Sequence, residues 1–176
     1  FFIPLLGFQQ VLLPLLSYHY GAGDNHRNRE ILKSSIIFSV SIMAVATGIF
    51  FLFPEKLVQI FSTESAIVAI GKYAFPVISI SFVFAGLTIV ITSYLQGIAR
   101  IKTSLFVIVL RQIVLLVPLA WLFHFMGLKA VWWTFPVTEI IASMTGILII
   151  LICRTRQTPL QKNDGRIARR IINKNP

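Results

Sequence analysis

The sequence predicts an all-α, polytopic helical membrane protein with about five transmembrane helices. Hydrophobic residues make up 56% of the 176 residues, charged residues only 12%, and the mean hydropathy is +0.83. A soluble domain carries about a quarter charged residues. The apolar residues also lie in long blocks and do not alternate with a polar face, as they do in a soluble amphipathic helix. Both observations favour helices that cross a lipid bilayer.

The lengths of the apolar blocks define the individual spans. A bilayer core about 30 Å thick needs about 20 apolar residues in a helix. The first predicted span ends at Gly21 and Gly23, which favour a helix C-terminus, and the second ends at Pro54, which cannot continue a helix. Single charged residues interrupt the fourth and fifth, namely Arg111 and Glu139. The five spans cover residues 1–22, 34–53, 73–99, 103–127 and 130–153.

Two segments are predicted to lie outside the spans. Residues 55–65 mix polar residues with apolar ones, which is typical of a short amphipathic segment at the membrane interface. Residues 154–176 form a basic tail whose RIARRII sequence either touches anionic lipid headgroups or is a disordered end. The predicted organisation is a transmembrane bundle over 1–153, followed by a cytoplasmic tail over 154–176. A start at Phe1, inside an apolar run, is expected of a fragment whose upstream part is missing.

The distribution of basic residues predicts the orientation. Five spans place alternate connections on opposite sides of the membrane. Twelve of the sixteen Lys and Arg residues fall on one side, in the 24–33 and 100–102 connections and the tail, and three fall on the other. Positive residues collect in the cytoplasm. We therefore predict a multi-pass protein of the cell (inner) membrane with a cytoplasmic C-terminus.

Several function classes are disfavoured. The net charge of +10 could suggest nucleic acid, but the basic residues flank apolar blocks and have no stacking aromatic residues among them. A lone Cys153 allows no internal disulfide framework. The sequence has no HExxH, GxGxxG or P-loop motif and no cluster of Cys and His. We expect no enzyme, no metal site and no cofactor.

Two ionisable residues lie deep in predicted spans, where a charge costs about 2.5–3.5 kcal/mol on insertion scales. At 1.5 Å per residue, Glu139 lies roughly 13 Å into its span, counted from Ala130. Arg111 lies roughly 12 Å into the longer 103–127 span, counted from Thr103 on the opposite, cytoplasmic side. Their depths then differ by about 10 Å, so we do not expect a direct ion pair. Arg111 is predicted to extend toward the cytoplasmic headgroups or to cap carbonyl groups of a neighbouring helix.

Glu139 is the first candidate for function. Trp132, Pro136, Ser143 and Gly146 follow helical spacing and should share its face. That face should look into the protein or a water-filled cavity. Two interpretations remain open, namely a proton, cation or substrate site, and a structural carboxyl group satisfied by a neighbouring helix.

Neutral polar residues at membrane depth complete the candidate path for substrate or ion. They could join helices or line a cavity. They are Gln9, Gln10, Thr88, Thr92, Gln96 and Ser143, and Thr88, Thr92 and Gln96 should share one helix face with Ala85. Prolines within the spans can kink their helices, as in transporters with interrupted helices. These prolines are Pro4, Pro14, Pro76, Pro118 and Pro136.

Several stretches resemble the C-terminal half of the multidrug and toxic compound extrusion (MATE) family, within the multidrug/oligosaccharidyl-lipid/polysaccharide flippase superfamily. GFQQVLLPLLSYHYGAGDNHRNRE (7–30) resembles the family's helix with a Gly and a Pro that ends in Tyr-Gly-Ala before arginines. SYLQGIARIKTSLFVIVLRQIVLLVPLAWLFHFMGLKAVWWTFPVTE (93–139) resembles the Leu-Gln-Gly turn, the Arg-Gln and Pro of the next helix, and the hairpin before Pro and an acid.

The resemblance implies twelve spans in two six-helix bundles around a central cavity, with this chain forming most of one bundle as helices eight to twelve. It implies efflux of cationic or amphipathic drugs by antiport with Na⁺ or H⁺, the lipid bilayer and the missing N-terminal bundle being the partners. Some sodium-coupled members carry a carboxylate in the tenth helix, which corresponds to 73–99, and this chain has none there. The alternatives are a flippase of lipid-linked oligosaccharides or polysaccharides, which would want basic residues lining the cavity, and a scaffold subunit with no transport cycle.

Overall fold

A computed structural model describes residues 2–62 and 64–156, so most of the predicted tail lies outside the described residues. Over these ranges the chain is helical, which confirms the predicted all-α class. The helices run in the order α1 (Phe2–Gly21), α2 (Asn25–Leu52), α3 (Pro54–Gln59), α4 (Ser65–Gly97), α5 (Ile101–Val109), the π-helical segment η1 (Leu110–Leu115), α6 (Leu116–His124), α7 (Leu128–Val131) and α8 (Thr134–Arg156).

Within residues 2–62 and 64–156, four helical stretches are long and apolar enough to cross a membrane, and they correspond to the second to fifth predicted spans. They are Asn25–Leu52, Ser65–Gly97, Ile101–His124 and Lys129–Ile152. The first predicted span corresponds to α1, which has 20 residues but is not one of these four. Gln9, Gln10 and His19 dilute its apolar content.

Two helices extend well beyond their predicted apolar blocks. Helix α2 begins at Asn25, nine residues before the predicted start at 34, and α4 begins at Ser65, eight residues before 73. Apolar content marks where a chain can enter lipid, but a capped helix continues into the polar region. The carboxylate of Asp24 provides such a cap for α2, because Asp24 Oδ1 accepts a hydrogen bond from the Arg27 N–H at 3.0 Å.

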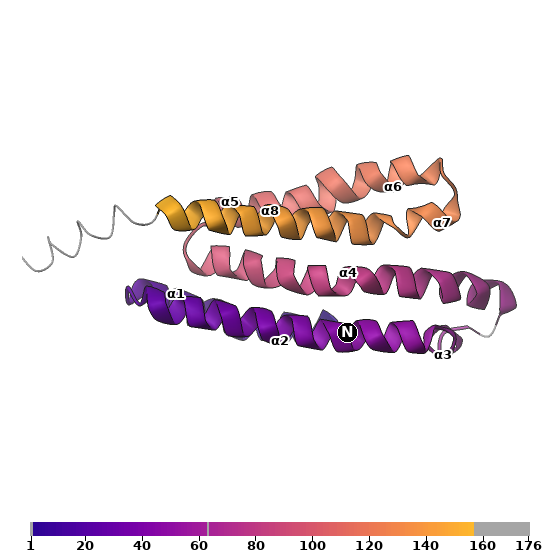
Figure 1. Ribbon diagram of the computed structural model, residues 1–176, viewed down its shortest axis with the longest axis horizontal. Helices are drawn as coiled ribbons and strands as arrows, with labels where there is room; N and C mark the ends of the chain where they lie inside the picture. Colours follow the sequence, from indigo (N-terminus) through magenta and orange to yellow (C-terminus); the bar gives the residue numbers. More distant parts are fainter. Residues whose placement is uncertain (1, 63, 157–176) are drawn as a thin grey trace, which may run out of the picture.

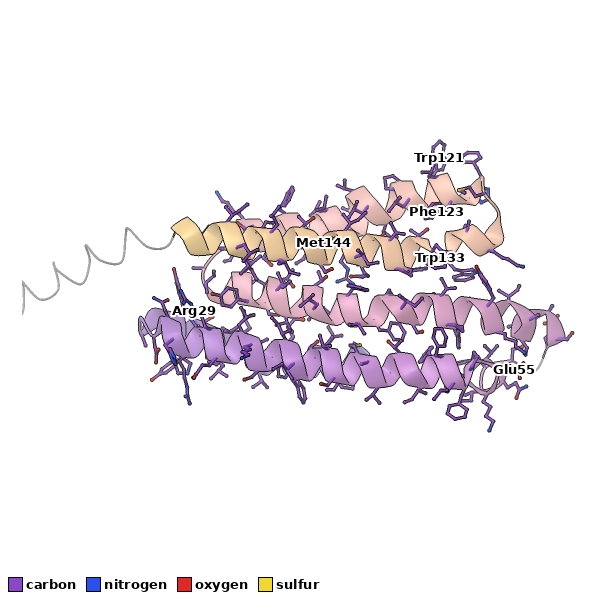
Figure 2. The ribbon with its side chains drawn as sticks, viewed as in Figure 1. Arg29, Glu55, Trp121, Phe123, Trp133 and Met144 are labelled. Atoms are coloured by element: carbon purple, nitrogen blue, oxygen red, sulfur yellow. The ribbon has the colours of Figure 1, made fainter. Side chains whose placement is uncertain are left out.

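Helix α4 is the centre of the bundle. It lies between α1 and α2 on one side and the α5–η1–α6 rod and α8 on the other, as Figure 1 shows. Leu5, Met43 and Phe82 form one core cluster between α1, α2 and α4. Ile91 and Val107 belong to a second cluster on the other side of α4. The turns after α1 and α4 lie at one end, here called the basic end, where Figure 2 labels Arg29. The segment α3, with Glu55, lies at the opposite end.

Glycines on α4 let its neighbours approach closely. A Cβ atom on Gly86 would lie 2.7 Å from Ser39 Oγ and 2.9 Å from Met43 Cγ of α2. A Cβ atom on Gly97 would lie 2.6 Å from Leu16 Cβ of α1. Small residues at helix contacts are typical of membrane bundles, in which lipid provides no hydrophobic driving force for association.

The segment at 55–65 is only partly the interfacial element that its composition predicts. Val58 of α3 is 4% exposed, because it packs onto Gly71 of α4. Glu55 of α3 forms an ion pair with Lys72 of α4. Ile60 and Phe61, by contrast, are highly exposed. Contacts with α4 therefore hold α3, and only its far side remains for the membrane interface.

Both turns at the basic end have the same hydrogen-bond pattern. After α1, the Asp24 N–H donates to the His19 carbonyl at 3.0 Å and Gly23 has a φ of 74°. After α4, the Arg100 N–H donates to the Leu95 carbonyl at 2.8 Å and Ala99 has a φ of 59°. This six-residue closure around a left-handed residue is the Schellman motif, which glycine favours. The predicted cap after α1 is correct, with Gly23 as the left-handed residue.

We expect Gly86→Val to lower the free energy of unfolding by about 1–3 kcal/mol, because the added side chain overpacks the contact between α4 and α2. The matched control is Gly48→Val on α2, since a Cβ atom there meets no atom of another helix within 4 Å. Thermal unfolding of the full-length protein in detergent measures both. Equal losses for the two variants would show that close approach at Gly86 does not matter.

Candidate functional site

An ion pair inside the bundle joins the two ionisable residues singled out from the sequence. Arg111 Nη2 lies 2.6 Å from Glu139 Oε1. The Arg111 side chain is 21% exposed and that of Glu139 only 11%. A contact this short is a charge-assisted hydrogen bond. The pair links η1 to α8.

The prediction that these residues do not pair is therefore wrong. The prediction assumes that the helices carrying Arg111 and Glu139 are straight and have the same rise per residue throughout. In the structure, η1 is π-helical, and α8 begins at Thr134 and not at residue 130. The two side chains span the remaining offset along the bundle. Arg111 consequently binds Glu139 and does not extend to the headgroups, so only that alternative of the prediction is wrong, and a structural role for Arg111 stays a prediction.

The π-helical hydrogen bonding has a local cause. Pro118 has no N–H, so the carbonyl of Val114 loses its α-helical donor. Just before it, the Leu116 N–H donates to the Arg111 carbonyl, five residues earlier. Single π-turns inside α-helices are frequent at functional sites. Here the π-turn carries the arginine of the ion pair.

Most of the predicted face around Glu139 is present. Pro136, Ser143 and Gly146 are buried with it on α8. A Cβ atom on Gly146 would lie 2.9 Å from Ile91 Cγ2, so this face packs against α4. Trp132 does not share it, because it lies in the turn between α7 and α8. Pro136 is the third residue of α8, where a missing N–H needs no helical partner.

Three buried oxygen atoms on α8 lack a hydrogen-bond partner within the described part of the chain. They are Glu139 Oε2, Thr134 Oγ1 and Thr138 Oγ1. The Ser143 hydroxyl, by contrast, donates to the Ile140 carbonyl of its own helix at 2.9 Å. Buried polar atoms are normally satisfied, so these three oxygens keep unused hydrogen-bonding capacity, and Glu139 Oε2 is the one on an ionisable group. Thr134 and Thr138 were not predicted from the sequence, although their spacing of four residues places them on one face.

The polar residues of α4 divide into two groups. Thr88 and Thr92 are buried, as their shared face predicts, but their hydroxyls donate to carbonyls of α4 itself. Gln96 is half-buried, and its Nε2 donates to Ser104 Oγ of α5 at 3.1 Å. Ser104 Oγ in turn donates to the Thr92 carbonyl at 3.1 Å. Gln96 thus joins α4 to α5, and Ser104 is a further residue that the sequence analysis missed.

The two glutamines of α1 lie apart from Glu139. Gln9 is half-buried and Gln10 is exposed. Helices α1 and α8 pack on opposite sides of α4 (Figure 1). The structure thus brings Arg111 to Glu139, but it separates both residues from Gln9 and Gln10.

The ion pair should have a measurable effect on stability. We expect Arg111→Gln to lower the free energy of unfolding by about 3–5 kcal/mol, because it leaves a buried carboxylate unpaired. Glu139→Gln should cost less, because the freed arginine can extend toward the headgroups. The double variant should recover most of the loss in a thermal unfolding assay, and Gln112→Ala, an exposed neighbour of Arg111, is the control. Strictly additive losses would mean that the contact contributes nothing.

Comparison with known proteins identifies the family. A family model described as MatE matches residues 1–122. The multidrug export protein MepA of Staphylococcus saprophyticus is 27% identical over 154 residues, covering 88% of this chain and 34% of its own length. MepA of Staphylococcus aureus is 23% identical, with the same coverage. The chain thus spans about a third of the length of these relatives.

Solved structures agree with this assignment. The MATE multidrug transporter DinF-BH superposes with a TM-score of 0.80 at 26% identity, covering 87% of this chain and 34% of that one. A MATE protein solved in a complex has the same fold, with a TM-score of 0.79 at 21% identity, covering 92% of this chain and 36% of that one. The chain therefore belongs to the MatE family, as the resemblance of its sequence motifs predicted.

Proposed function

We propose that this chain is part of a transporter that exports cationic or amphipathic compounds in exchange for Na⁺ or H⁺. The observation that carries the proposal is the MatE match over 1–122, together with the fold shared with a multidrug transporter at a TM-score of 0.80. The relatives that it matches are named as multidrug export proteins. Because the chain spans about a third of their length, transport belongs to a longer protein that also supplies the N-terminal bundle.

Glu139 is the residue that we propose for the ion path. It is buried at membrane depth and retains an unpartnered oxygen among the described residues. Protons and small cations are the ligands that such a carboxylate binds, and ionisable residues inside spans usually mark pathways. Ser143 lies one turn further along the same buried face of α8. Thr88, Thr92 and Gln96 on α4, and Gln9 and Gln10 on α1, stay as candidates for the substrate path.

The flippase alternative is less well supported. An anionic lipid-linked sugar requires free basic residues within the cavity. Arg111 is the basic residue deepest within the described spans, and Glu139 already balances its charge at 2.6 Å. A non-transporting scaffold has no need of a carboxylate oxygen at membrane depth that lacks a partner within the described chain. The exporter remains the better-supported function.

Transport by the full-length protein can be tested in vesicles. We expect it to release a preloaded cationic dye when an inward gradient of Na⁺ or H⁺ is imposed, because the gradient drives the exchange. Dye fluorescence measures the release. Empty vesicles and vesicles without a gradient are the controls. The absence of gradient-dependent release across a panel of cationic dyes would contradict the proposal.

The orientation can be tested in the same protein. We propose that the basic end faces the cytoplasm, with the chain in the cell (inner) membrane and its C-terminus inside, because positive residues collect there. His26 is 86% exposed at the basic end, and Lys56 is exposed on α3 at the other. In a cysteine-free form of the full-length protein, we expect an impermeant maleimide added to whole cells to label Lys56→Cys but not His26→Cys. The reverse pattern would invert the assignment.

A further inference from the structure

We infer that Arg111 is a built-in competitor of the coupling cation at Glu139. The guanidinium and a small cation, Na⁺ or H⁺, would occupy the carboxylate in turn and not together. This inference rests on the proposed function, because it assigns the regulation of the same carboxylate. It adds a role for Arg111 that holds whichever of the two cations drives transport.

Arg111 contacts only one of the two oxygen atoms of the Glu139 carboxylate. Arg111 Nη2 contacts Glu139 Oε1 at 2.6 Å, whereas Oε2 is buried without a hydrogen-bond partner among the described residues. An ionised carboxylate has about four lone-pair sites, so one donor leaves most of its capacity unfilled. Glu139 Oε2 thus has capacity for a small cation, on a carboxylate that the arginine already neutralises.

Electrostatics makes the two cations mutually exclusive. The elements packed against α8 are α4, α5, η1 and α6, and α7 precedes it in the chain. Among these elements, Arg111 is the charged group that faces Glu139. Their other charged or titratable groups lie toward the bundle ends or bind elsewhere, namely Lys72, Tyr73, Tyr94, Lys102, His124 and Lys129. One carboxylate balances one arginine. A second cation would leave a net positive charge in a medium of low dielectric, where like charges repel strongly.

Arg111 lies at a point where the packing of the α5–η1–α6 rod changes, which favours release of its side chain from Glu139. Arg111 lies in the π-helical turn η1, and its neighbours Gln112, Ile113 and Val114 are exposed. Helix α5, before this turn, packs against α4 and α8, whereas α6, after it, packs against α7 and α8. The ion pair therefore ties the rod to α8 at the point where its contacts with α4 end. Release of Arg111 would remove that tie and leave only packing contacts between the rod and α8.

Cation-dependent thermal unfolding of the purified full-length protein tests the competition. NaCl is titrated against choline chloride at constant ionic strength, and pH is varied separately in choline chloride, so that the two arms distinguish Na⁺ from H⁺. A cation that binds the folded protein raises the melting temperature by mass action. We expect Arg111→Gln to lower the concentration of Na⁺ or H⁺ needed for half of the response by about tenfold or more, which corresponds to about 1.4 kcal/mol.

Three further variants make the outcome decisive. Glu139→Gln and the double variant Arg111→Gln/Glu139→Gln should lose the cation response, because neither keeps the carboxylate. If Arg111→Gln is unfolded in choline chloride, its recovery on adding Na⁺ or H⁺ gives the same test, and the double variant should not depend on either cation. Arg111→Lys, which keeps the positive charge, should respond like the wild type. An unchanged half-response concentration in Arg111→Gln, or a response that persists without the Glu139 carboxylate, would overturn the inference. Dye release measured in parallel separates this failure from a failure of the proposed export function.

Discussion

Close contact between α4 and its neighbours is the constraint on which the rest of the bundle depends. In lipid, apolar side chains gain little by leaving one apolar surface for another, so helices associate through van der Waals contact and interhelical hydrogen bonds. Gly86 and Gly97 provide that contact toward α2 and α1. Thr47 adds a hydrogen bond from α2 to the Ser79 carbonyl of α4 at 2.9 Å. The neighbouring helices take their positions from this central one.

The ion pair between Arg111 and Glu139 can be understood from this arrangement. Once α4 fixes α8 through the contact of Gly146 with Ile91, the carboxylate of Glu139 is committed to a buried position. A carboxylate buried without a counter-charge is strongly destabilising. The π-turn at η1 delivers the guanidinium that it requires. Packing of α8 against α4 thus determines where the Glu139 carboxylate lies. The buried carboxylate then requires a counter-charge, which Arg111 of η1 provides.

The sequence predicted much of this fold, because long apolar blocks have few physical interpretations. It also identified Glu139 and Arg111 as the charged residues at depth. Their contact could not be predicted by counting residues, since the hydrogen bond from Leu116 to the Arg111 carbonyl changes the register of a helix that looks regular in sequence. Trp132 was wrongly predicted to share the helix face of Glu139, because a turn after α7 delays the start of the last helix to Thr134. Thr88 and Thr92 share the predicted face, yet their hydroxyls bind their own helix, which periodicity cannot reveal.

The two turns at the basic end differ in the residue that takes the left-handed conformation, which is Gly23 after α1 and Ala99 after α4. A left-handed conformation costs a residue with a Cβ atom about 1–2 kcal/mol relative to the right-handed form, and Gly23 avoids this cost at the equivalent position. The turn after α1 is thus favoured by its own residues. The turn after α4 depends on the hydrogen bonds from Gln96 to Ser104 and from Ser104 to the Thr92 carbonyl. We therefore expect the second turn to need the contacts of α5 to offset the cost at Ala99, which the first turn does not need.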